Sequence, residues 1–405
     1  MPAASRMRIL YAHPFAQPVS GPDESLIGLL RCLRGEIEAF VALPPGSPHC
    51  ERYGSAGATI IEQPMQRIRR TTNPFDLARY GGLFLPETSR FVQLIRRHKI
   101  ELVHTNMEVV LQSGLAARLA RVPSVYHVRG TSFASPRRVC DAVVGAINRF
   151  ADEIIVISQA VGEIFYERGV RDKVNVIYNS LDPSSFDNVS KANVAALREE
   201  LTGGEPNAPL VATVGRINPR KGLECFVRAA ALVSRSHPQA RFAVVGDAAH
   251  DLEREYLTQL RRTAEELGVN DNLVFAPARR NIAELMTALD LFVMTTINEG
   301  FGRVAIEAMA ARRAVVASRV GGLPEIVEEE ATGRLVAAGE AEEFAGAITE
   351  LLAAPETLRR MGAAGRWRVE NLFSDEANAP AVLEVYQRLL PSREESPIAM
   401  RASQT

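Results

Sequence analysis

Short apolar runs alternate with amphipathic stretches along most of the chain, and this alternation limits the possible folds more than any other feature. Helical periodicity lies between the runs, for example from Glu87 to His98 and from Gly222 to Ser236. Parallel strands need long crossover connections, which are usually helices. The strand candidates are RILYA, EAFVAL, ATII, LVHT, SVYHV and EIIVIS in the first half, and LVATVG, RFAVVG, NLVFA, LFVMT and AVVAS in the second. The sequence therefore predicts an α/β chain with a parallel sheet in each half.

The repeated strand pattern also predicts the domain organisation, because a chain of 405 residues is long enough for two hydrophobic cores. Between the halves, a polar stretch rich in turn-forming residues indicates a linker with one short helix. Near the end, APAVLEVYQRLL predicts a helix that returns to the first domain. The expected divisions are an N-terminal domain over 1–185, a linker over 186–208, a second domain over 209–372, the returning helix over 373–390 and a disordered tail over 391–405.

Charge and composition exclude several classes of protein. The formal net charge is -1, from 47 basic and 48 acidic residues, so bulk positive charge does not favour a nucleic-acid partner. The N-terminus shows no signal-peptide pattern, and no apolar run reaches the length of a membrane helix. We therefore expect a cytoplasmic protein that contacts a membrane only peripherally. Four cysteines lie far apart in the sequence and indicate neither a zinc site nor a disulfide framework: Cys32, Cys50, Cys140 and Cys225.

Loops that follow strands carry the candidate functional residues, because open parallel sheets bind ligands at the carboxyl ends of their strands. The first such loop is VGRINPRKG, in which Gly215 ends a strand, Arg216 follows it and Lys221 lies near the start of the next helix. Two cations beside a helix amino end suit a diphosphate, since the formal charges and the helix dipole have the same sign there. A solvated basic loop is the alternative interpretation.

The second loop is NEGFGRVAIEAMA, which follows the strand candidate LFVMT. Gly300 and Gly302 permit close approach of a ligand at the head of a helix that we expect to begin near Arg303. Glu299 precedes that head, and Glu307 lies one turn inside the helix. A carboxylate accepts two hydroxyl hydrogen bonds at once, which suits the vicinal diols of a ribose or hexose. The helix dipole alone also explains Glu307, but it does not explain Glu299 together with the glycines.

Two stretches of the first half are weaker candidates. YHVRGTS follows a strand, and its His127 could either hydrogen-bond a sugar or be structural. SGPDES has Pro22 as a helix-entry residue, with Asp23 and Glu24 in the first turn. This second pattern indicates either a ligand-binding loop or only a favourable helix start.

Taken together, these stretches resemble the retaining glycosyltransferases of family four. The resemblance rests on EGFGRVAIEAMA, GRINPRKG, HTN with AARLARVPSVYHVRG, VISQAV, VIYNSLD and VGGLPEIV, and it spans nearly the whole chain. It implies the GT-B fold, in which two Rossmann-like parallel-sheet domains face a central cleft and a C-terminal helix crosses back to the N-terminal domain. It also implies a nucleoside-diphosphate sugar as the donor substrate, with no other cofactor.

The resemblance further implies roles for individual residues. Arg216 and Lys221 hold the donor diphosphate, Glu307 binds the ribose, and His127 lies beside the transferred sugar. The implied catalytic residues are His127, Arg216, Lys221 and Glu299, and the implied donor-binding residues are Gly21, Gly215, Arg216, Lys221, Glu299, Gly300, Phe301, Gly302 and Glu307. The sequence departs from the family in two places. A single Gly21 stands where members often have a glycine pair, and Gly130 stands where they often have an acidic residue.

The expected reaction moves a hexose from a UDP- or GDP-linked donor to a hydroxyl of a glycan, lipid-linked or small-molecule acceptor. Two cations and a helix amino end offset the cost of the departing diphosphate. We find no compact acidic cluster for a metal ion, and the family implies retention by front-face attack. The alternatives are a nucleotide-sugar epimerase and a non-catalytic sugar-nucleotide-binding module, whereas the first loop lacks the glycine pattern of a nicotinamide dehydrogenase.

The acceptor is not indicated by any motif. Two basic and partly amphipathic stretches of the first domain, MQRIRRTTNPFDLARYGG and ETSRFVQLIRRHK, are candidate contacts with an anionic membrane surface on the inner face of the membrane. Solvated helix faces are the alternative interpretation of both stretches.

Overall fold

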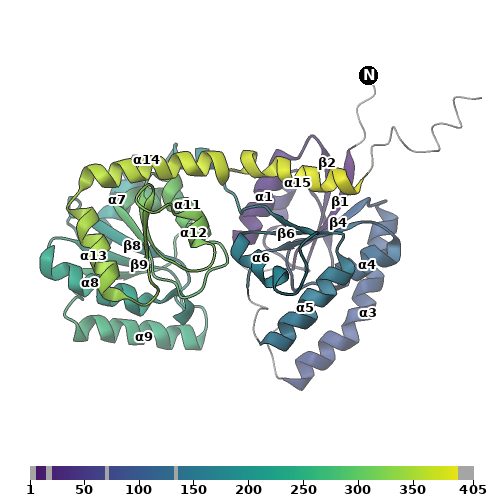
Figure 1. Cartoon of the computed structure of the whole chain (residues 1–405), viewed down its shortest axis with the longest axis horizontal. Helices are drawn as coiled ribbons and strands as arrows, with labels where there is room; N and C mark the ends of the chain where they lie inside the picture. The colour runs from purple at the N-terminus through teal and green to yellow at the C-terminus, as the bar shows by residue number, and fades with distance from the viewer. Residues whose placement is uncertain (1–5, 15–20, 69–72, 132–135, 391–405) are drawn as a thin grey trace, which may run out of the picture. The chain divides into compact units, whose positions relative to one another are not determined.

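The computed structural model describes residues 6–14, 21–68, 73–131 and 136–390, and the chain divides into two compact units (Figure 1). Unit 1 comprises Met1–Ser180 and Asp375–Thr405, and unit 2 comprises Leu181–Ser374. The stretch 186–208, which the sequence indicates as a linker, contains helix α7 (Lys191–Leu201) and belongs to unit 2. The expected tail over 391–405 lies outside the described residues.

The described part of unit 1 is built on a seven-stranded parallel sheet in the order β3-β2-β1-β4-β5-β6-β7. The six strands expected from the apolar runs are all present, and β7 is an additional one. Its three residues are each only half-buried, so it has no apolar run to reveal it. The strands are β1 (Met7–Ala12), β2 (Ile37–Leu43), β3 (Thr59–Glu62), β4 (Leu102–Thr105), β5 (Ser124–Val128), β6 (Glu153–Val156) and β7 (Val174–Val176).

Helices cover both faces of this sheet, and alternate residues of β1 show which helices cover which face. Ile9 and Tyr11 pack in one apolar cluster with α1 and α15, whereas Leu10 and Ala12 pack in another with α3 and α4. Successive side chains of a strand point to opposite faces, so β1 is buried on both sides. The helices of unit 1 are α1 (Gly21–Cys32), α2 (Cys50–Ser55), α3 (Pro74–Arg97), α4 (Gln112–Ala120), α5 (Arg137–Phe150), α6 (Gln159–Tyr166) and α15 (Asp375–Leu389).

Unit 2 contains a six-stranded parallel sheet in the order β10-β9-β8-β11-β12-β13, counted over its described residues. The five expected strands are present, and β13 is additional. The strands are β8 (Leu210–Val214), β9 (Arg241–Val245), β10 (Leu273–Ala276), β11 (Leu291–Met294), β12 (Ala314–Ser318) and β13 (Gly333–Val336). The other helical elements are η1 (Pro183–Phe186), η2 (Pro219–Lys221), α8 (Leu223–Ser236), α9 (Asp251–Glu266), α10 (Ile282–Ala288), α11 (Arg303–Ala310), α12 (Leu323–Ile326), α13 (Ala341–Leu352) and α14 (Pro355–Leu372).

The last helix returns to unit 1, as the sequence predicts. Helix α14 belongs to unit 2, whereas α15 begins at Asp375 and packs beside α1 in unit 1 (Figure 1). Helices α1 and α15 are in close contact at Gly28, where an added Cβ would lie 2.2 Å from Asp375 Oδ2. Among the described residues, no helix has the length and apolar content that crossing a membrane requires.

Candidate functional site

In unit 2, the loops after β8 and β11 meet where the strand order changes direction. β8 and β11 are neighbours in the sheet, although β9 and β10 lie between them in the sequence. The backbone N–H of Ile297 donates to the carbonyl oxygen of Arg220 over 2.9 Å, and Thr296 Oγ1 donates to the same oxygen over 2.9 Å. Thr295 Oγ1 donates to the carbonyl oxygen of Lys221 over 3.2 Å. The two loops predicted to bind the donor are therefore held together at a topological switch point, where α/β sheets bind their ligands.

Lys221 and Glu299 form an ion pair between these loops. Lys221 Nζ donates to Glu299 Oε2 over 2.7 Å, and their side chains are 28% and 20% exposed. An ammonium group has three N–H donors, so this contact leaves others that can bind a ligand. Partial exclusion of water strengthens such charges relative to a fully exposed pair. The structure thus brings two of the predicted catalytic residues into direct contact, which their separation in the sequence does not show.

Arg216 lies in the same loop as Lys221 but is much more exposed. Its side chain is 59% exposed, and its Nε is 3.9 Å from Glu253 Oε1, which is too long for a hydrogen bond. Glu253 is itself fixed, because it accepts the backbone N–H groups of Ala249 over 2.8 Å and of His250 over 3.4 Å. Glu253 is not among the site residues predicted from the sequence. Its place in the first turn of a helix that follows a strand-end loop is the signal that could have identified it.

Glycines fix the backbone around Glu299. Gly302 precedes α11, which begins at Arg303 as expected, and it has a φ of +110°. Gly321, which the sequence analysis did not single out, has a φ of +52°, and an added Cβ there would lie 1.7 Å from the carbonyl oxygen of Glu299. Any other residue at Gly321 would displace the Glu299 backbone.

Phe301 and the remaining predicted glycines have mainly backbone roles in the structure. The Phe301 side chain is 2% exposed, and its ring packs edge-on against Phe373 with 5.8 Å between the ring centroids. Gly300 is buried beside it. Gly215 follows the last residue of β8, and its N–H donates to the carbonyl oxygen of Val245 over 3.0 Å. Contacts from these residues to a ligand would therefore come from backbone atoms.

Glu307 pairs with Arg303 one turn earlier in α11. Arg303 Nε donates to Glu307 Oε1 over 3.0 Å, and both side chains are 16% exposed. Residues four apart are neighbours on a helix surface, so the sequence spacing contained this signal, although the sequence analysis did not use it. The carboxylate predicted to bind the ribose is thus partly shielded and held by a cation.

In unit 1, His127 lies in β5 and is 3% exposed. Neither of its ring nitrogens has a hydrogen-bond partner among the described residues. Its ring centroid is 5.3 Å from that of His104, another buried histidine. Burial, followed by the charge of Arg129 and by His104, holds the pKa of His127 well below its usual value. The imidazole is therefore neutral, with one donor and one acceptor nitrogen for a ligand.

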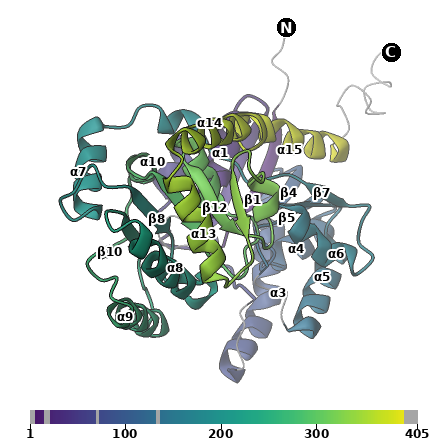
Figure 2. The same ribbon diagram turned by 60° about the vertical axis from the view of Figure 1, so that its left-hand side comes forward.

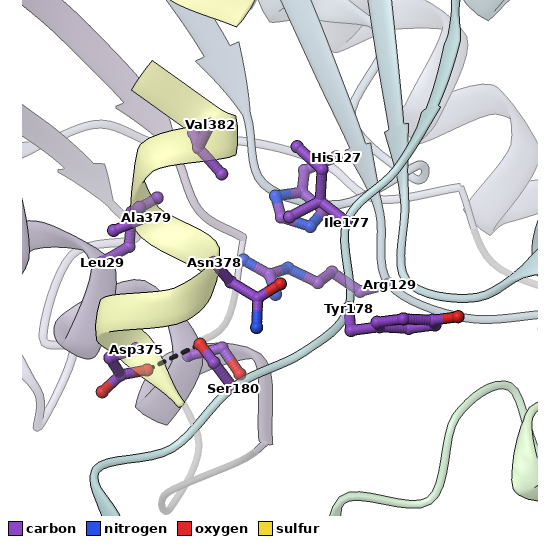
Figure 3. A pocket seen from close by; sticks show the side chains of 11 residues that line it. Leu29, His127, Arg129, Ile177, Tyr178, Ser180, Asp375, Asn378, Ala379 and Val382 are labelled. Carbon is purple, nitrogen blue, oxygen red and sulfur yellow. Dashed lines mark hydrogen bonds between the residues drawn. The ribbon is translucent and has the colours of Figure 1, made fainter. Parts of the chain in front are cut away.

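His127 lines a pocket within unit 1 (Figure 3). The pocket has an empty volume of about 280 Å³, part of it open to solvent. On its wall, Ser180 Oγ donates to Asp375 Oδ1 over 2.6 Å. His127 and Arg129 lie on one side, and Asn378 of α15 lies near them (Figure 3). The full lining is Ser25, Leu29, His127, Arg129, Ile177, Tyr178, Ser180, Asp375, Asn378, Ala379 and Val382.

A buried polar network that the sequence analysis missed connects Arg129 to Asp23. Arg129 Nε donates to Asn106 Oδ1 over 3.0 Å, so the Nδ2 group of Asn106 faces His13 Nδ1, 2.9 Å away. His13 Nε2 then lies 2.9 Å from Asp23 Oδ1, to which the Tyr53 hydroxyl also donates over 3.0 Å. A guanidinium can only donate, so Asn106 Oδ1 accepts from Arg129 and Asn106 Nδ2 donates to His13 Nδ1. His13 Nε2 therefore donates to Asp23 Oδ1. Asp23 is therefore a buried acceptor rather than only a residue that favours the start of α1.

Two further observations concern Gly21 and metal binding. Gly21 is the first residue of α1, but residues 15–20 before it lie outside the described part of the chain. Among the described residues, no three His, Cys, Asp or Glu side chains are grouped so that they could hold a metal ion.

Two family models match the chain on either side of the division between the units. Residues 20–180 match the glycosyl transferase 4-like domain, and residues 201–368 match the glycosyl transferases group 1 family. The chain belongs to the family-four glycosyltransferases, with the GT-B fold. The resemblance inferred from the sequence motifs is thereby confirmed.

Curated relatives of this chain carry different names. The D-inositol 3-phosphate glycosyltransferase of Segniliparus rotundus is 40% identical over 221 residues, which are 54% of this chain and 47% of that protein. The alpha-maltose-1-phosphate synthase of Mycobacterium tuberculosis is 34% identical over 226 residues, which are 53% of this chain and 57% of that protein. The chain thus spans about half the length of the curated relatives it matches.

Solved structures match this chain over nearly its whole length. Anabaena Alr3699/HepE in complex with UDP and glucose has a TM-score of 0.79 at 26% identity, and the match covers 94% of this chain and 100% of that one. The same protein was also solved with UDP-glucose. The sucrose-phosphate synthase of Thermosynechococcus elongatus has a TM-score of 0.73 at 25% identity, covering 95% of this chain and 99% of that one.

Proposed function

We propose that this chain transfers a hexose from a uridine diphosphate sugar to a hydroxyl acceptor, with retention at the anomeric carbon and without a metal ion. The observation that carries the proposal is the Lys221–Glu299 ion pair, which lies between the joined loops at the switch point of unit 2. The complexes of Alr3699/HepE with UDP, glucose and UDP-glucose support the choice of donor. A cytoplasmic location, as expected from the sequence, fits this proposal.

Lys221 and Glu299 act by exchanging partners when the donor binds. Lys221 Nζ and Glu299 Oε2 neutralise each other over 2.7 Å. A diphosphate offers Lys221 a more strongly charged partner, so Glu299 is released to accept hydrogen bonds from the sugar hydroxyls. As the donor bond breaks, negative charge grows on the departing phosphate, and Lys221 and Arg216 stabilise it. These two cations supply the countercharge, so we expect activity to persist in excess EDTA.

Glu307 has the supporting role of binding the ribose. Arg303 holds one carboxylate oxygen over 3.0 Å and keeps the group in one orientation. A carboxylate has several acceptor sites and can therefore bind a diol while this bond remains.

Retention follows if the acceptor attacks on the face from which the nucleotide leaves. The departing phosphate oxygen then takes the acceptor proton, and no protein nucleophile is needed. His127 offers a hydrogen bond to a sugar hydroxyl, because its imidazole is neutral and both ring nitrogens lack partners among the described residues. The acceptor would be a glycan, a lipid-linked molecule or a small molecule. The anomeric configuration of the product, read from proton NMR couplings, tests retention.

The first experiment is a titration of the full chain with UDP, GDP, ADP and dTDP, with NAD as a control. A ligand that binds only the native state raises its melting temperature. We expect UDP to give the largest shift and heat of binding, whereas GDP in its place would correct the donor base. A response to none of these nucleotides in folded protein would contradict the donor site. Incubation with UDP-glucose then separates the reactions, because a transferase forms a glycoside and an epimerase forms an epimer without any acceptor.

A further inference from the structure

Arg216 is the less restrained of the two cations predicted to bind the donor diphosphate. Its side chain is 59% exposed, whereas Lys221 is bonded to Glu299 over 2.7 Å. No hydrogen bond joins the Arg216 guanidinium to another residue in the described part of the chain, and Glu253 is its one ion-pair neighbour there. Ordering a long arginine side chain costs rotamer entropy, so a partner that restrains it in advance strengthens its contact with a ligand.

Glu253 has a fixed carboxylate with one oxygen available for such a contact. The residue is buried in the first turn of α9, and its Oε2 accepts the backbone N–H groups of Ala249 over 2.8 Å and of His250 over 3.4 Å. Its other oxygen, Oε1, has no hydrogen-bond partner among the described residues and lies 3.9 Å from Arg216 Nε. The two N–H bonds therefore hold the carboxylate so that Oε1 faces the arginine.

The backbones that carry these two side chains are held together independently of the contact between them. β8 and β9 are neighbours in the sheet of unit 2, and the N–H of Ile217 donates to the carbonyl oxygen of Asp247 over 3.0 Å. The same loops approach closely at Gly246, where an added Cβ would lie 1.9 Å from the carbonyl oxygen of Gly215. A small movement of the exposed Arg216 side chain therefore suffices to shorten the 3.9 Å contact to a hydrogen bond.

Helix α9 is also tied to the helix that follows the Arg216 loop. Helix α8 begins at Leu223 directly after that loop, and the backbone N–H of Glu224 donates to the Tyr256 hydroxyl of α9 over 3.3 Å. The two helices lie side by side in unit 2 (Figures 1 and 2). The amino end of α9, and Glu253 with it, is thereby held beside the loop that carries both cations.

The geometry of a guanidinium allows Arg216 to bind Glu253 and a diphosphate at the same time. Its N–H donors form a planar fork, and Nε is the nitrogen that pairs with Glu253. The two terminal nitrogens are thus left to donate to phosphate oxygens in the bidentate manner that arginine favours. A guanidinium between the two anions attracts the phosphate over a shorter distance than the carboxylate repels it, so the net effect favours binding.

From these contacts we propose that Glu253 is a positioning residue, which orders Arg216 for the diphosphate of the donor. This role rests on the proposed function, because it requires a nucleoside diphosphate at the loop after β8. Glu253 acts through Arg216 and does not itself touch the donor.

Glu253→Gln separates this role from a structural one. The glutamine oxygen can accept the same two backbone N–H groups, whereas its NH2 group then faces a guanidinium that also only donates. UDP should bind the full-chain variant about fivefold more weakly in calorimetry, which is the upper end for a partly exposed ion pair. Uridine, which lacks the diphosphate, should bind as it does to the parent, and the melting temperature should not change.

A double-mutant cycle with Arg216→Met tests whether Glu253 acts through Arg216. In the Arg216→Met background, Glu253→Gln should change UDP affinity by less than about twofold, because the side chain that it positions is absent. Glu266→Gln in α9 is the matched control, since it also alters a carboxylate paired with an arginine, and it should bind UDP like the parent.

Several results would overturn the positioning role of Glu253. Equal loss of UDP and uridine affinity in Glu253→Gln would show a structural effect, and a full additional loss in the Arg216→Met background would show that Glu253 acts independently of Arg216. Tighter UDP binding would show that repulsion by the carboxylate dominates. Unchanged UDP binding by Glu253→Gln, with a parent that binds UDP, overturns the positioning role alone. If the parent itself binds no nucleoside diphosphate, the proposed function fails and this role fails with it.

Discussion

At the scale of single residues, the two predicted cations of the donor site are not equivalent. Lys221 is 28% exposed and bonded to Glu299, whereas Arg216 is 59% exposed and only 3.9 Å from its carboxylate neighbour. A charge that is fixed and partly shielded from water stabilises a transition state better than one that must first be ordered. We therefore expect Lys221 to contribute more to the rate than Arg216.

Substitution of each cation tests whether Lys221 contributes more to the rate than Arg216. Lys221→Met should lower kcat/KM by about a hundredfold, equivalent to about 3 kcal/mol of transition-state stabilisation. Arg216→Met should lower kcat/KM clearly less than Lys221→Met does. Steady-state rates with the donor identified by titration provide the measurement. A loss below about threefold for Lys221→Met would remove it from the site.

Glu307 should affect donor binding more than chemistry. Its proposed contact is to the ribose, which does not react, so Glu307→Gln should weaken binding of the free nucleoside diphosphate by about tenfold in calorimetry. The matched control is Glu224→Gln in α8, which also removes a carboxylate paired with an arginine four residues away. If both variants bind the nucleotide as tightly as the parent, the ribose is bound elsewhere.

At the scale of elements, α3 depends on one buried carboxylate at its midpoint. Glu87 is 1% exposed and its Oε2 accepts the backbone N–H of Gln66 over 2.8 Å and the Nε2 group of Gln112 over 3.0 Å. Burial raises the pKa of Glu87, and the bonds from Gln66 and Gln112 lower it by less. The favourable contribution of Glu87 to folding stability is therefore complete below its unfolded pKa, where the carboxyl group is protonated. This contribution is lost as the pH rises through the folded pKa.

Glu87→Gln should remove this pH dependence. The variant should gain stability relative to the parent as the pH rises from about 4.5 to about 8, because the amide stays neutral. Hydrogen exchange of the α3 amides at both pH values measures the effect. Glu38→Gln, at an exposed carboxylate of β2, is the control. A constant difference between parent and Glu87→Gln across this range would show that Glu87 does not titrate as inferred.

The sequence predicted elements well where burial produces a clear pattern. Strands such as β1 and β11 appear as apolar runs because they are buried on both faces. In contrast, β7 and β13 are short and partly exposed, so their sequences do not differ from loops. Helix α3 was predicted only over Glu87 to His98, since none of the described side chains from Phe75 to Pro86 is fully buried and this part contains helix-weakening glycine and proline.

Site residues were predictable only where their loops are continuous in the sequence. The loops of Lys221 and Glu299 follow apolar strands, so polar residues stood out there. The network of unit 1 was missed because its members come from separate elements: Asn106 and His13 are 93 residues apart, and Arg129 and Asn106 are 23 apart. Only the packing of strand ends in a parallel sheet brings such residues together.

At the scale of the whole molecule, each unit has its own apolar core, so the two should respond separately to ligand. The proposed donor groups all belong to unit 2, and the single tryptophan of the chain, Trp367, lies on α14 in the same unit. UDP at saturating concentration should raise the unfolding midpoint seen by Trp367 fluorescence and slow hydrogen exchange mainly in Leu181–Ser374. Protection confined to unit 1 would place nucleotide binding there.

Acid should destabilise unit 1 through its buried histidines. Burial, followed by the charge of Arg129, lowers the pKa of His104 from 6.5 to about 3, and its Nδ1 lies 2.7 Å from the Tyr386 hydroxyl. Tyr11 and His127 pack against the same ring, and the pKa of His127 is lowered as well. A histidine with a lowered folded pKa contributes stability that is complete above the unfolded pKa and is lost as the pH falls toward the folded pKa.

The parent should therefore lose stability in unit 1 between about pH 6.5 and about pH 4, and His104→Gln should lose less because one of the two neighbouring imidazoles with a lowered pKa is absent. Urea unfolding followed by hydrogen exchange of β4 and β5 measures this at each pH. Trp367 fluorescence reports unit 2 in the same samples, which separates a local effect from acid unfolding of the whole chain. An equal acid loss in parent and His104→Gln would show that His104 is already protonated in the folded state or does not couple to folding. Since α15 supplies Tyr386 to this cluster, a confirmed effect would also show that the returning helix shares the stability of unit 1 rather than that of the unit from which it emerges.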